Sequence, residues 1–267
     1  MWLEGKVAVV YGGGGAIGGA VARAFAREGA RVHLAGRTQA RLDAVAAEIV
    51  AAGGQAECAA LDVLDEEAVE HHASAVAEAT GRFDVMLNAV GISHVQGTPL
   101  LELGYDEYAH PLEGYTRSNF LTARAAARRM VRQGTGVILM LSTPGARMAG
   151  GGFMGYGAAC AAVEAMTRHL AGELGPHGVR AVCLRSDAIP EALGRHSHTA
   201  EVFRKAAQQA GMTVDGMLAE RARSATLLQR LPTLQQLADA AVFAASDRAG
   251  AVTACLLNVT CGSVVDV

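Results

Sequence analysis

The sequence is poor in lysine and in aromatic residues, and it has no long apolar run and no block of charge of one sign. Its 267 residues include only two lysines, Lys6 and Lys205, and 4% are aromatic. No apolar run approaches the roughly 20 residues that a membrane-spanning helix requires. The net charge is -3, so the chain offers no basic stripe for nucleic acid. We therefore expect neither a membrane nor a nucleic acid among its partners.

Cysteine is scarce and irregularly placed. The five cysteines are odd in number and lack CxxC spacing, a pattern that favours neither a disulfide framework nor a zinc site. We expect no metal, and we expect most of the cysteines to be small buried side chains. The first six residues contain no basic leader with an apolar signal core, so we expect a cytoplasmic protein.

Short apolar runs alternate with helical patterns along the whole chain. Continuous apolar strands separated by helices of ten or more residues indicate a parallel sheet covered on both faces, and right-handed crossovers make it doubly wound. We predict a single α/β domain over residues 1–267, a Rossmann fold with a seven-stranded parallel sheet. The expected strands are Val7-Tyr11, Val32-Ala35, Ala56-Leu61, Val85-Asn88, Val137-Leu141, Val179-Leu184 and Cys255-Val259.

One segment breaks the alternation. Ser186 to Pro232 is a long polar and helical excursion between the sixth strand and the last helix. It leaves the carboxyl end of a strand, where open α/β sheets bind ligands. We interpret it as a substrate lid at about 186–232; the alternative is a plain surface helical hairpin.

A glycine run joins the first strand to the first helix. Glycine lets the backbone approach a pyrophosphate, and the N–H groups at a helix start favour phosphate. Between strand and helix, such a run is a strong indication of a dinucleotide site. The candidate cofactor residues here are Gly12, Gly14, Gly15, Ala16, Ile17 and Gly18.

The glycine run and the later segment Tyr156-Gly-Ala-Ala-Cys160 together resemble motifs of the short-chain dehydrogenase/reductase family, and the resemblance extends from end to end. The loop is similar to the family's TGxxxGxG, with Tyr11 in place of Thr and Ala16 in place of the middle Gly. The resemblance implies a nicotinamide cofactor, a small-molecule substrate and a homodimer or homotetramer. The alanine-rich faces of Ala123-Ala127 and Ala158-Ala165 would allow close helix approach between subunits.

The residues after the second strand bear on the choice of cofactor. An NAD-preferring enzyme places an acidic residue there to hold the ribose 2′-OH, whereas this chain has Gly36-Arg37-Thr38. An arginine pairs instead with a 2′-phosphate. Arg37 therefore favours NADP over NAD; the alternative is a surface arginine without a ligand.

Two further loops resemble adenosine contacts of the family. Asp62-Val63 follows the third strand, and Asp62 is the candidate acceptor for the adenine amino group. The alternative is that Asp62 caps the next helix. After the fourth strand, Asn88-Ala89-Val90-Gly91 resembles the family's NNAG segment without its second Asn. Asn88, Ala89 and Gly91 are expected to shape the loop under the adenosine.

At the catalytic end, the family has Asn, Ser, Tyr and Lys around the nicotinamide. The resemblance implies that Tyr156 exchanges a proton with the substrate oxygen. Cys160 stands where the family has Lys, whose ammonium lowers the tyrosine pKa. A cysteine supplies no such charge, and we interpret Cys160 as a small buried filler, with a reactive thiol as the alternative.

The other two family positions are also altered. Thr143 lies thirteen residues before Tyr156 and keeps a hydroxyl in the Ser position, while the neighbouring Ser142 is expected to point the other way if the strand pleat persists. The Asn position falls on Tyr115, and Asn119 lies one helical turn later. Pro111 and Gly114 are expected to make this helix irregular.

The sixth strand ends differently from the family pattern, in which Pro-Gly lies near the nicotinamide. This chain has Ser186-Asp187. Asp187 is expected either to be neutralised by Arg185 or to act as an acid or base. In the excursion, His196 and His198 are further proton-transfer candidates.

Two functions remain open from the sequence. The first is a redox enzyme in which NADPH reduces a carbonyl, with Tyr156 as proton donor and Thr143 as the anchor of the oxygen. The second is a protein of the same fold that no longer transfers hydride: a cyclase, an isomerase, a dehydratase or a non-catalytic ligand-binding or partner-binding protein.

Overall fold

Seven parallel strands form one sheet at the centre of the computed structural model, which describes residues 1–194 and 199–266. The strand order is β3-β2-β1-β4-β5-β6-β7, so the chain starts mid-sheet and winds outward in both directions. This confirms the predicted doubly wound α/β sheet. The strands are β1 (Val7–Tyr11), β2 (Arg31–Gly36), β3 (Gln55–Ala60), β4 (Val85–Asn88), β5 (Gly136–Ser142), β6 (Val179–Ser186) and β7 (Cys255–Val259).

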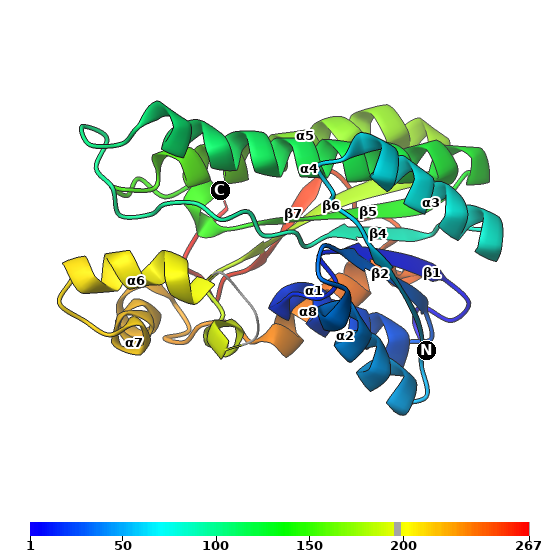
Figure 1. Cartoon of the computed structure of the whole chain (residues 1–267), viewed down its shortest axis with the longest axis horizontal. Helices are drawn as coiled ribbons and strands as arrows, with labels where there is room; N and C mark the ends of the chain where they lie inside the picture. Colours follow the sequence, from blue (N-terminus) through cyan, green and yellow to red (C-terminus); the bar gives the residue numbers. More distant parts are fainter. Residues whose placement is uncertain (195–198, 267) are drawn as a thin grey trace.

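Helices cover both faces of the sheet (Figure 1). One apolar core lies between the sheet and α1, α2 and α8, and a second lies between the sheet and α3, α4 and α5. The remaining helices, α6 and α7, lie to one side of the sheet (Figure 1). The helices are α1 (Ala16–Arg27), α2 (Gln39–Ala51), α3 (Glu66–Thr80), α4 (Tyr105–Gln133), α5 (Met154–Leu174), α6 (Thr199–Gln209), α7 (Val214–Ala225) and α8 (Leu234–Ala245), with short 3-10 turns at η1 (Pro144–Ala146), η2 (Gly175–His177), η3 (Pro190–Gly194) and η4 (Asp247–Ala249).

The register of the strands brings their carboxyl ends together. Tyr11 at the end of β1 pairs with Asn88 at the end of β4, and Ser142 at the end of β5 pairs with Arg185 of β6. Because all seven strands are parallel, the loops that follow these residues meet at one edge of the sheet. That edge carries the candidate site.

Two expectations about α4 are wrong. It is one continuous helix of 29 residues that includes Pro111 and Gly114, so the backbone hydrogen bond that the proline removes does not end the helix. The alanines of 123–127 are buried in the chain's own second core, so they leave no small-residue face for another subunit.

The cysteines are free. Cys160 and Cys183 are buried, whereas Cys58, Cys255 and Cys261 are half-buried, so the expectation that most are buried is wrong. Among the described residues, no helix is both long and apolar enough to cross a lipid bilayer.

Candidate active site

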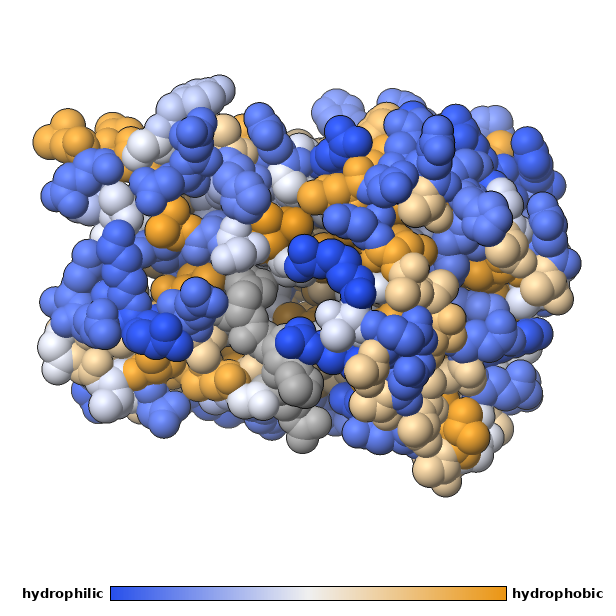
Figure 2. Space-filling view, viewed as in Figure 1, coloured by the Kyte–Doolittle hydropathy of each residue, from blue (hydrophilic) through white to orange (hydrophobic). Residues whose placement is uncertain are grey.

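A cavity of about 750 Å³ lies between the carboxyl ends of the strands and the excursion. The glycine loop forms one end, and the carboxyl ends of β5 and β6 with the start of α5 form the other. Figure 2 shows hydrophobic residues, in orange, in the hollow near the middle of the face that it presents. The excursion contributes Ile189, Ala192, Val202, Phe203, Ala206, Met217, Leu218 and Arg221 to the cavity wall.

At two positions of the glycine loop, the neighbouring backbone leaves no room for a side chain. Gly12 has φ +81°, and a Cβ there would lie 2.5 Å from the carbonyl oxygen of Ala89. A Cβ on Gly18 would lie 2.2 Å from the carbonyl oxygen of Gly12. Gly18 therefore lets α1 start close to the loop and does not itself line the cavity. The predicted residues that do line it are Gly12, Gly14, Gly15, Ala16 and Ile17.

The end of β2 brings two arginines to the cavity. Arg37 is exposed and lies on the wall beside Gly36 and Thr38, and Arg41 joins it from the first turn of α2. Sequence reasoning missed Arg41, which lies in the first turn of the helix that begins directly after Arg37 and Thr38. Two guanidinium groups thus lie at this end of the cavity.

The third and fourth strands end in tight loops. Val63 lines the cavity, whereas Asp62 is exposed, and its Oδ1 accepts a hydrogen bond from the Leu64 N–H. The alternative role for Asp62 as helix cap is wrong, because the carboxylate of Asp65 accepts from the Ala68 N–H and caps α3.

Asn88 shapes the next loop from beneath. Its amide donates to Thr122 at 3.0 Å and its Oδ1 accepts from the Val90 N–H at 3.1 Å. Ala89 and Gly91 line the cavity above it. The buried amide of Asn88 thus holds the loop in place without entering the cavity.

Tyr156, Thr143 and Cys160 meet at the end of the cavity away from the glycine loop. The hydroxyl of Thr143 lies 3.4 Å from the Cys160 sulfur. Loss of water around the Tyr156 hydroxyl raises its pKa well above the usual value, and the neighbouring Cys160 and Tyr115 raise it further, while a hydrogen bond with Thr143 opposes them. Burial also raises the pKa of the Cys160 thiol. Both groups are therefore neutral near pH 7, and Cys160 fits the filler interpretation.

Neither lysine compensates for Cys160. Lys6, just before the amino end of β1, pairs with Asp247, and the Lys205 ammonium donates to the Thr98 hydroxyl at 2.6 Å. Neither residue lines the cavity. Tyr156 thus has no ammonium group beside it.

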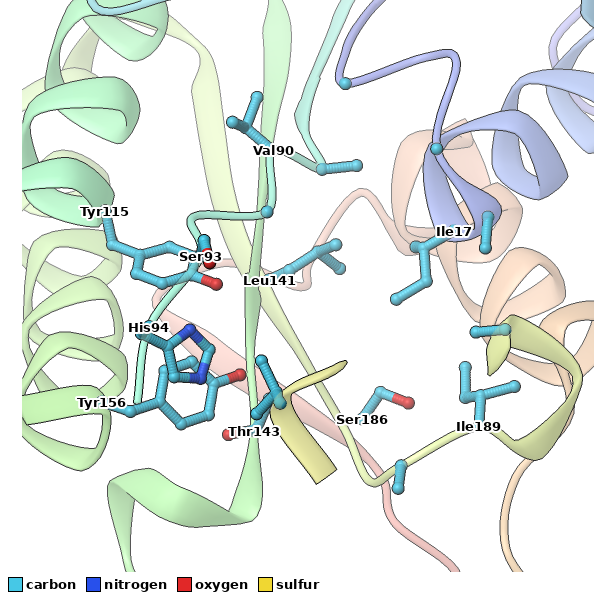
Figure 3. A pocket seen from close by; sticks show the side chains of 18 of the residues that line it. Ile17, Val90, Ser93, His94, Tyr115, Leu141, Thr143, Tyr156, Ser186 and Ile189 are labelled. Atoms are coloured by element: carbon cyan, nitrogen blue, oxygen red, sulfur yellow. The ribbon is translucent and has the colours of Figure 1, made fainter. Parts of the chain in front are cut away.

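An aromatic cluster surrounds Tyr156 instead. The His94 ring stacks on the Tyr156 ring with centroids 4.0 Å apart and planes 9° from parallel, and Tyr115 lies 5.8 Å from Tyr156. Figure 3 shows the three rings on one side of the cavity, opposite Ile17 and Ile189. No sequence pattern pointed to His94, because it lies in the loop after β4, 62 residues before Tyr156 along the chain.

Of the two candidate residues on α4, Tyr115 reaches the cavity and Asn119 does not. Tyr115 lines the cavity, and its hydroxyl lies 3.3 Å from the Ile92 nitrogen. Asn119 is buried, does not line the cavity, and donates to the carbonyl oxygen of Tyr115 at 2.9 Å.

A buried ionic cluster lies behind the catalytic end. The fully buried Arg185 donates two hydrogen bonds to Glu164, at 2.8 and 2.9 Å, and one to Asp266. Ser142 donates to Glu164 at 2.8 Å. Ser142 lines the cavity as Thr143 does, and both hydroxyls contact α5, one at Glu164 and the other at Cys160. The expectation that Ser142 points the other way is therefore not confirmed, and its hydroxyl is occupied by the carboxylate.

Asp187 is neutralised, but not by Arg185. Its carboxylate accepts from the Nε and Nη2 atoms of Arg221 at 2.7 and 2.9 Å and from the Ala188 N–H. The expected pairing with Arg185 is wrong because the Arg185 side chain is committed to Glu164 and Asp266. The candidates His196 and His198 lie outside the described residues.

Metal ligands do not gather in the described part of the chain, which contains no group of three or more His, Cys, Asp or Glu side chains placed to hold a metal ion. The polar side chains that line the cavity in the described part of the chain carry hydroxyls, guanidinium groups, one imidazole, the Gln96 amide and the paired carboxylate of Asp187. This set suits proton transfer and the binding of an anionic ligand.

Comparisons with known proteins agree with this arrangement. The family model described as enoyl-(acyl carrier protein) reductase matches residues 14–263. The short-chain reductase protein NovJ of Streptomyces niveus is 32% identical over 93% of this chain and 90% of its own. The 7alpha-hydroxysteroid dehydrogenase of Clostridium sardiniense is 30% identical over 97% of this chain and 94% of its own.

A solved structure is also similar to this one. NAD+-bound xylitol dehydrogenase superposes with a TM-score of 0.88 at 22% identity, over 98% of this chain and 100% of that one. At that identity the likeness shows the fold alone. Together with the family model and the relatives, it leads to one conclusion: the chain belongs to the short-chain dehydrogenase/reductase family.

Proposed function

We propose that this protein is an NADP(H)-dependent oxidoreductase that reduces a carbonyl group of a small, largely apolar substrate. One observation carries the proposal: the hydroxyls of Tyr156 and Thr143 share one cavity with the arginines Arg37 and Arg41. The hydroxyls suit a carbonyl oxygen, and the guanidinium groups suit a 2′-phosphate.

The glycine loop fits a dinucleotide. Cβ atoms at Gly12 and Gly18 would collide with backbone oxygens, so the chain keeps bare backbone where a pyrophosphate approaches the start of α1. Gly14, Gly15 and Ile17 would hold the pyrophosphate, Val63 and Ala89 would contact the adenosine, and Arg37 would pair with the 2′-phosphate. A bound reduced nicotinamide would supply the hydride for the carbonyl carbon.

The protein's own residues supply the proton. The raised pKa of Tyr156 keeps it a neutral phenol, and a neutral phenol donates its proton to the oxygen that gains charge during reduction. Thr143 anchors that oxygen through its hydroxyl. Alcohol oxidation would instead require a phenolate, so the site favours reduction.

The excursion favours apolar substrates. Val202, Phe203 and Met217 line the cavity from α6 and α7, and burial of apolar substrate surface against them is favourable. We propose that residues 186–232 act as the substrate lid, since the excursion closes one wall of the cavity.

A second function rests on Cys160. With a thiol in place of the lysine and no lysine on the cavity wall, a reaction without hydride transfer, such as a cyclisation, isomerisation or dehydration, needs only the acid and base groups that are present. This alternative predicts NADPH binding without NADPH oxidation.

The deciding experiment follows the absorbance of reduced nicotinamide during incubation with a panel of ketones and aldehydes. Tyr156→Phe should lower the rate by about 100-fold or more, whereas Tyr105→Phe, at an exposed position on α4, should not change it. NADPH binding without oxidation across the panel would favour the second function. Gain of activity in Cys160→Lys from an inactive parent would show that only the cation is missing.

We also propose a homodimer or homotetramer. Support comes from Phe120 on α4 and Met154 on α5, whose side chains are 51% and 49% exposed, since large exposed apolar groups on paired helices favour association. Light scattering of the purified protein measures the assembly directly.

A further inference from the structure

The positive charge that the family's lysine provides has a candidate replacement in this cavity. Of the described residues on the cavity wall, the basic ones are Arg37, Arg41, Arg221 and His94. The first two lie at the glycine-loop end, and Arg221 is paired with Asp187. His94 is the basic group that contacts Tyr156 directly.

The contact is face to face. With centroids 4.0 Å apart and planes 9° from parallel, a protonated imidazole lies over the phenol ring at a distance where a cation and a π face attract each other. The attraction grows when the phenol loses its proton, because the ring then carries a full negative charge. An imidazolium stacked on the ring thus stabilises the phenolate electrostatically, as a lysine ammonium beside the phenol would.

Hydrogen bonds hold the His94 ring in this position. Nδ1 lies 2.7 Å from the carbonyl oxygen of Ile92, which only accepts, so Nδ1 carries a proton. Nε2 lies 3.0 Å from the side-chain amide of Gln96, which is buried. The Gln96 amide donates an N–H to Nε2 when the imidazole is neutral. When Nε2 carries a proton, the amide group can rotate by 180° so that its oxygen accepts that proton's hydrogen bond. Both charge states of His94 therefore keep the ring stacked.

Two further titratable side chains that the structure describes beside the pair are neutral. Tyr115 faces it from α4 and Cys160 from α5. Burial raises the pKa of both, so neither carries charge near pH 7. Of these three described neighbours of the Tyr156 ring and hydroxyl, His94 is the one that can bring a positive charge.

We propose that His94, protonated and stacked on Tyr156, supplies the positive charge that stabilises the Tyr156 phenolate as the phenol gives up its proton. His94 is a positioning residue that acts through Tyr156. The inference rests on the proposed function for its catalytic meaning, because proton donation to a substrate oxygen is the step that it assists. The Tyr156 O–H bond breaks, its proton goes to the substrate oxygen, and the phenolate later regains a proton from water.

The first test needs no turnover. A fluorinated tyrosine with a lowered phenol pKa is installed at position 156, and its phenolate absorbance is titrated against pH in the full protein. His94→Gln and His94→Phe should each raise the phenol pKa by about one unit or more, since the first removes the charge and the second keeps an aromatic stack without it. Unchanged phenol titration in both folded variants would overturn the proposal.

The second test uses catalysis. His94→Gln should lower the rate of carbonyl reduction about tenfold and change its pH profile, because it removes a titratable ring from the face of Tyr156. In a Cys160→Lys background, the ammonium takes over and His94→Gln should cost much less. An equal loss in both backgrounds would assign His94 a merely structural role.

The two tests separate this inference from the proposed function. A shifted phenol titration without NADPH oxidation would leave the His94 effect standing and reject the reductase. Brisk NADPH oxidation with an unshifted phenol titration would reject the His94 effect alone.

Discussion

Arg221 of α7 holds Asp187 in a two-pronged ion pair at the end of β6, with N–O distances of 2.7 and 2.9 Å. The Asp187 side chain is 2% exposed and that of Arg221 is 25% exposed. The pair therefore ties the excursion to the sheet across the cavity wall. It also cancels a charge that would otherwise lie beside the substrate.

Removal of the Arg221–Asp187 ion pair should make the excursion less firmly packed against the sheet. Arg221→Ala leaves the Asp187 carboxylate buried without its partner, so we expect the KM for a carbonyl substrate to rise by about tenfold, with faster proteolysis of residues 186–232. The matched control is Arg223→Ala on the same helix, whose ion pair with Glu220 is exposed. Equal behaviour of the two variants would contradict the role given to Arg221.

Arg37 should decide the cofactor. Arg37→Ala removes the guanidinium that we propose pairs with the 2′-phosphate, so the Kd for NADPH should rise by roughly tenfold to 100-fold while that for NADH stays unchanged. Calorimetric titration with both cofactors measures this. The control is Arg27→Ala at the end of α1, where the side chain contacts Gln235. Tighter binding of NADH than NADPH by the parent would reject the NADP assignment.

Glu164 should matter for stability. Glu164→Gln replaces the two-oxygen carboxylate on the fully buried Arg185 guanidinium with one neutral amide oxygen, while the ion pair with the partly exposed Asp266 remains. We therefore expect the free energy of unfolding to fall by about 3 kcal/mol. Glu48→Gln breaks an ion pair with Arg23 at a carboxylate that is 59% exposed, and should cost about 1 kcal/mol or less. Urea unfolding of both variants provides the comparison, and similar losses would show that the buried cluster adds no special stability.

His72 should make the fold sensitive to acid. Burial lowers its pKa from 6.5 to about 4, so between these values the unfolded chain binds a proton that the folded chain does not. Stability from this group is fully present above pH 6.5 and is lost as pH falls toward 4, by about 3 kcal/mol in total. His72→Phe should flatten this part of the curve in urea unfolding at several pH values. An unchanged slope in the variant would contradict the assignment.

The sequence predicted the fold well because the fold depends on local patterns. Apolar runs marked all seven strands, and the glycine run marked the turn into α1, where Gly12 and Gly18 leave no room for a side chain. The sequence-based predictions of ion-pair partners were wrong where the actual partner lies far away along the chain. Arg185 lies two residues from Asp187 but pairs with Glu164 and Asp266, 21 and 81 residues away.

The candidate site divides in the same way. The sequence by itself determined the doubly wound sheet, the glycine loop between β1 and α1, and the spacing of Tyr156 and Cys160, since each is carried by contiguous residues. Only the tertiary structure decided that His94 stacks on Tyr156, that Arg221 neutralises Asp187 and that Ser142 points to Glu164. These contacts join loops and helices far apart in the chain, and their formation depends on packing and burial, which no local pattern encodes.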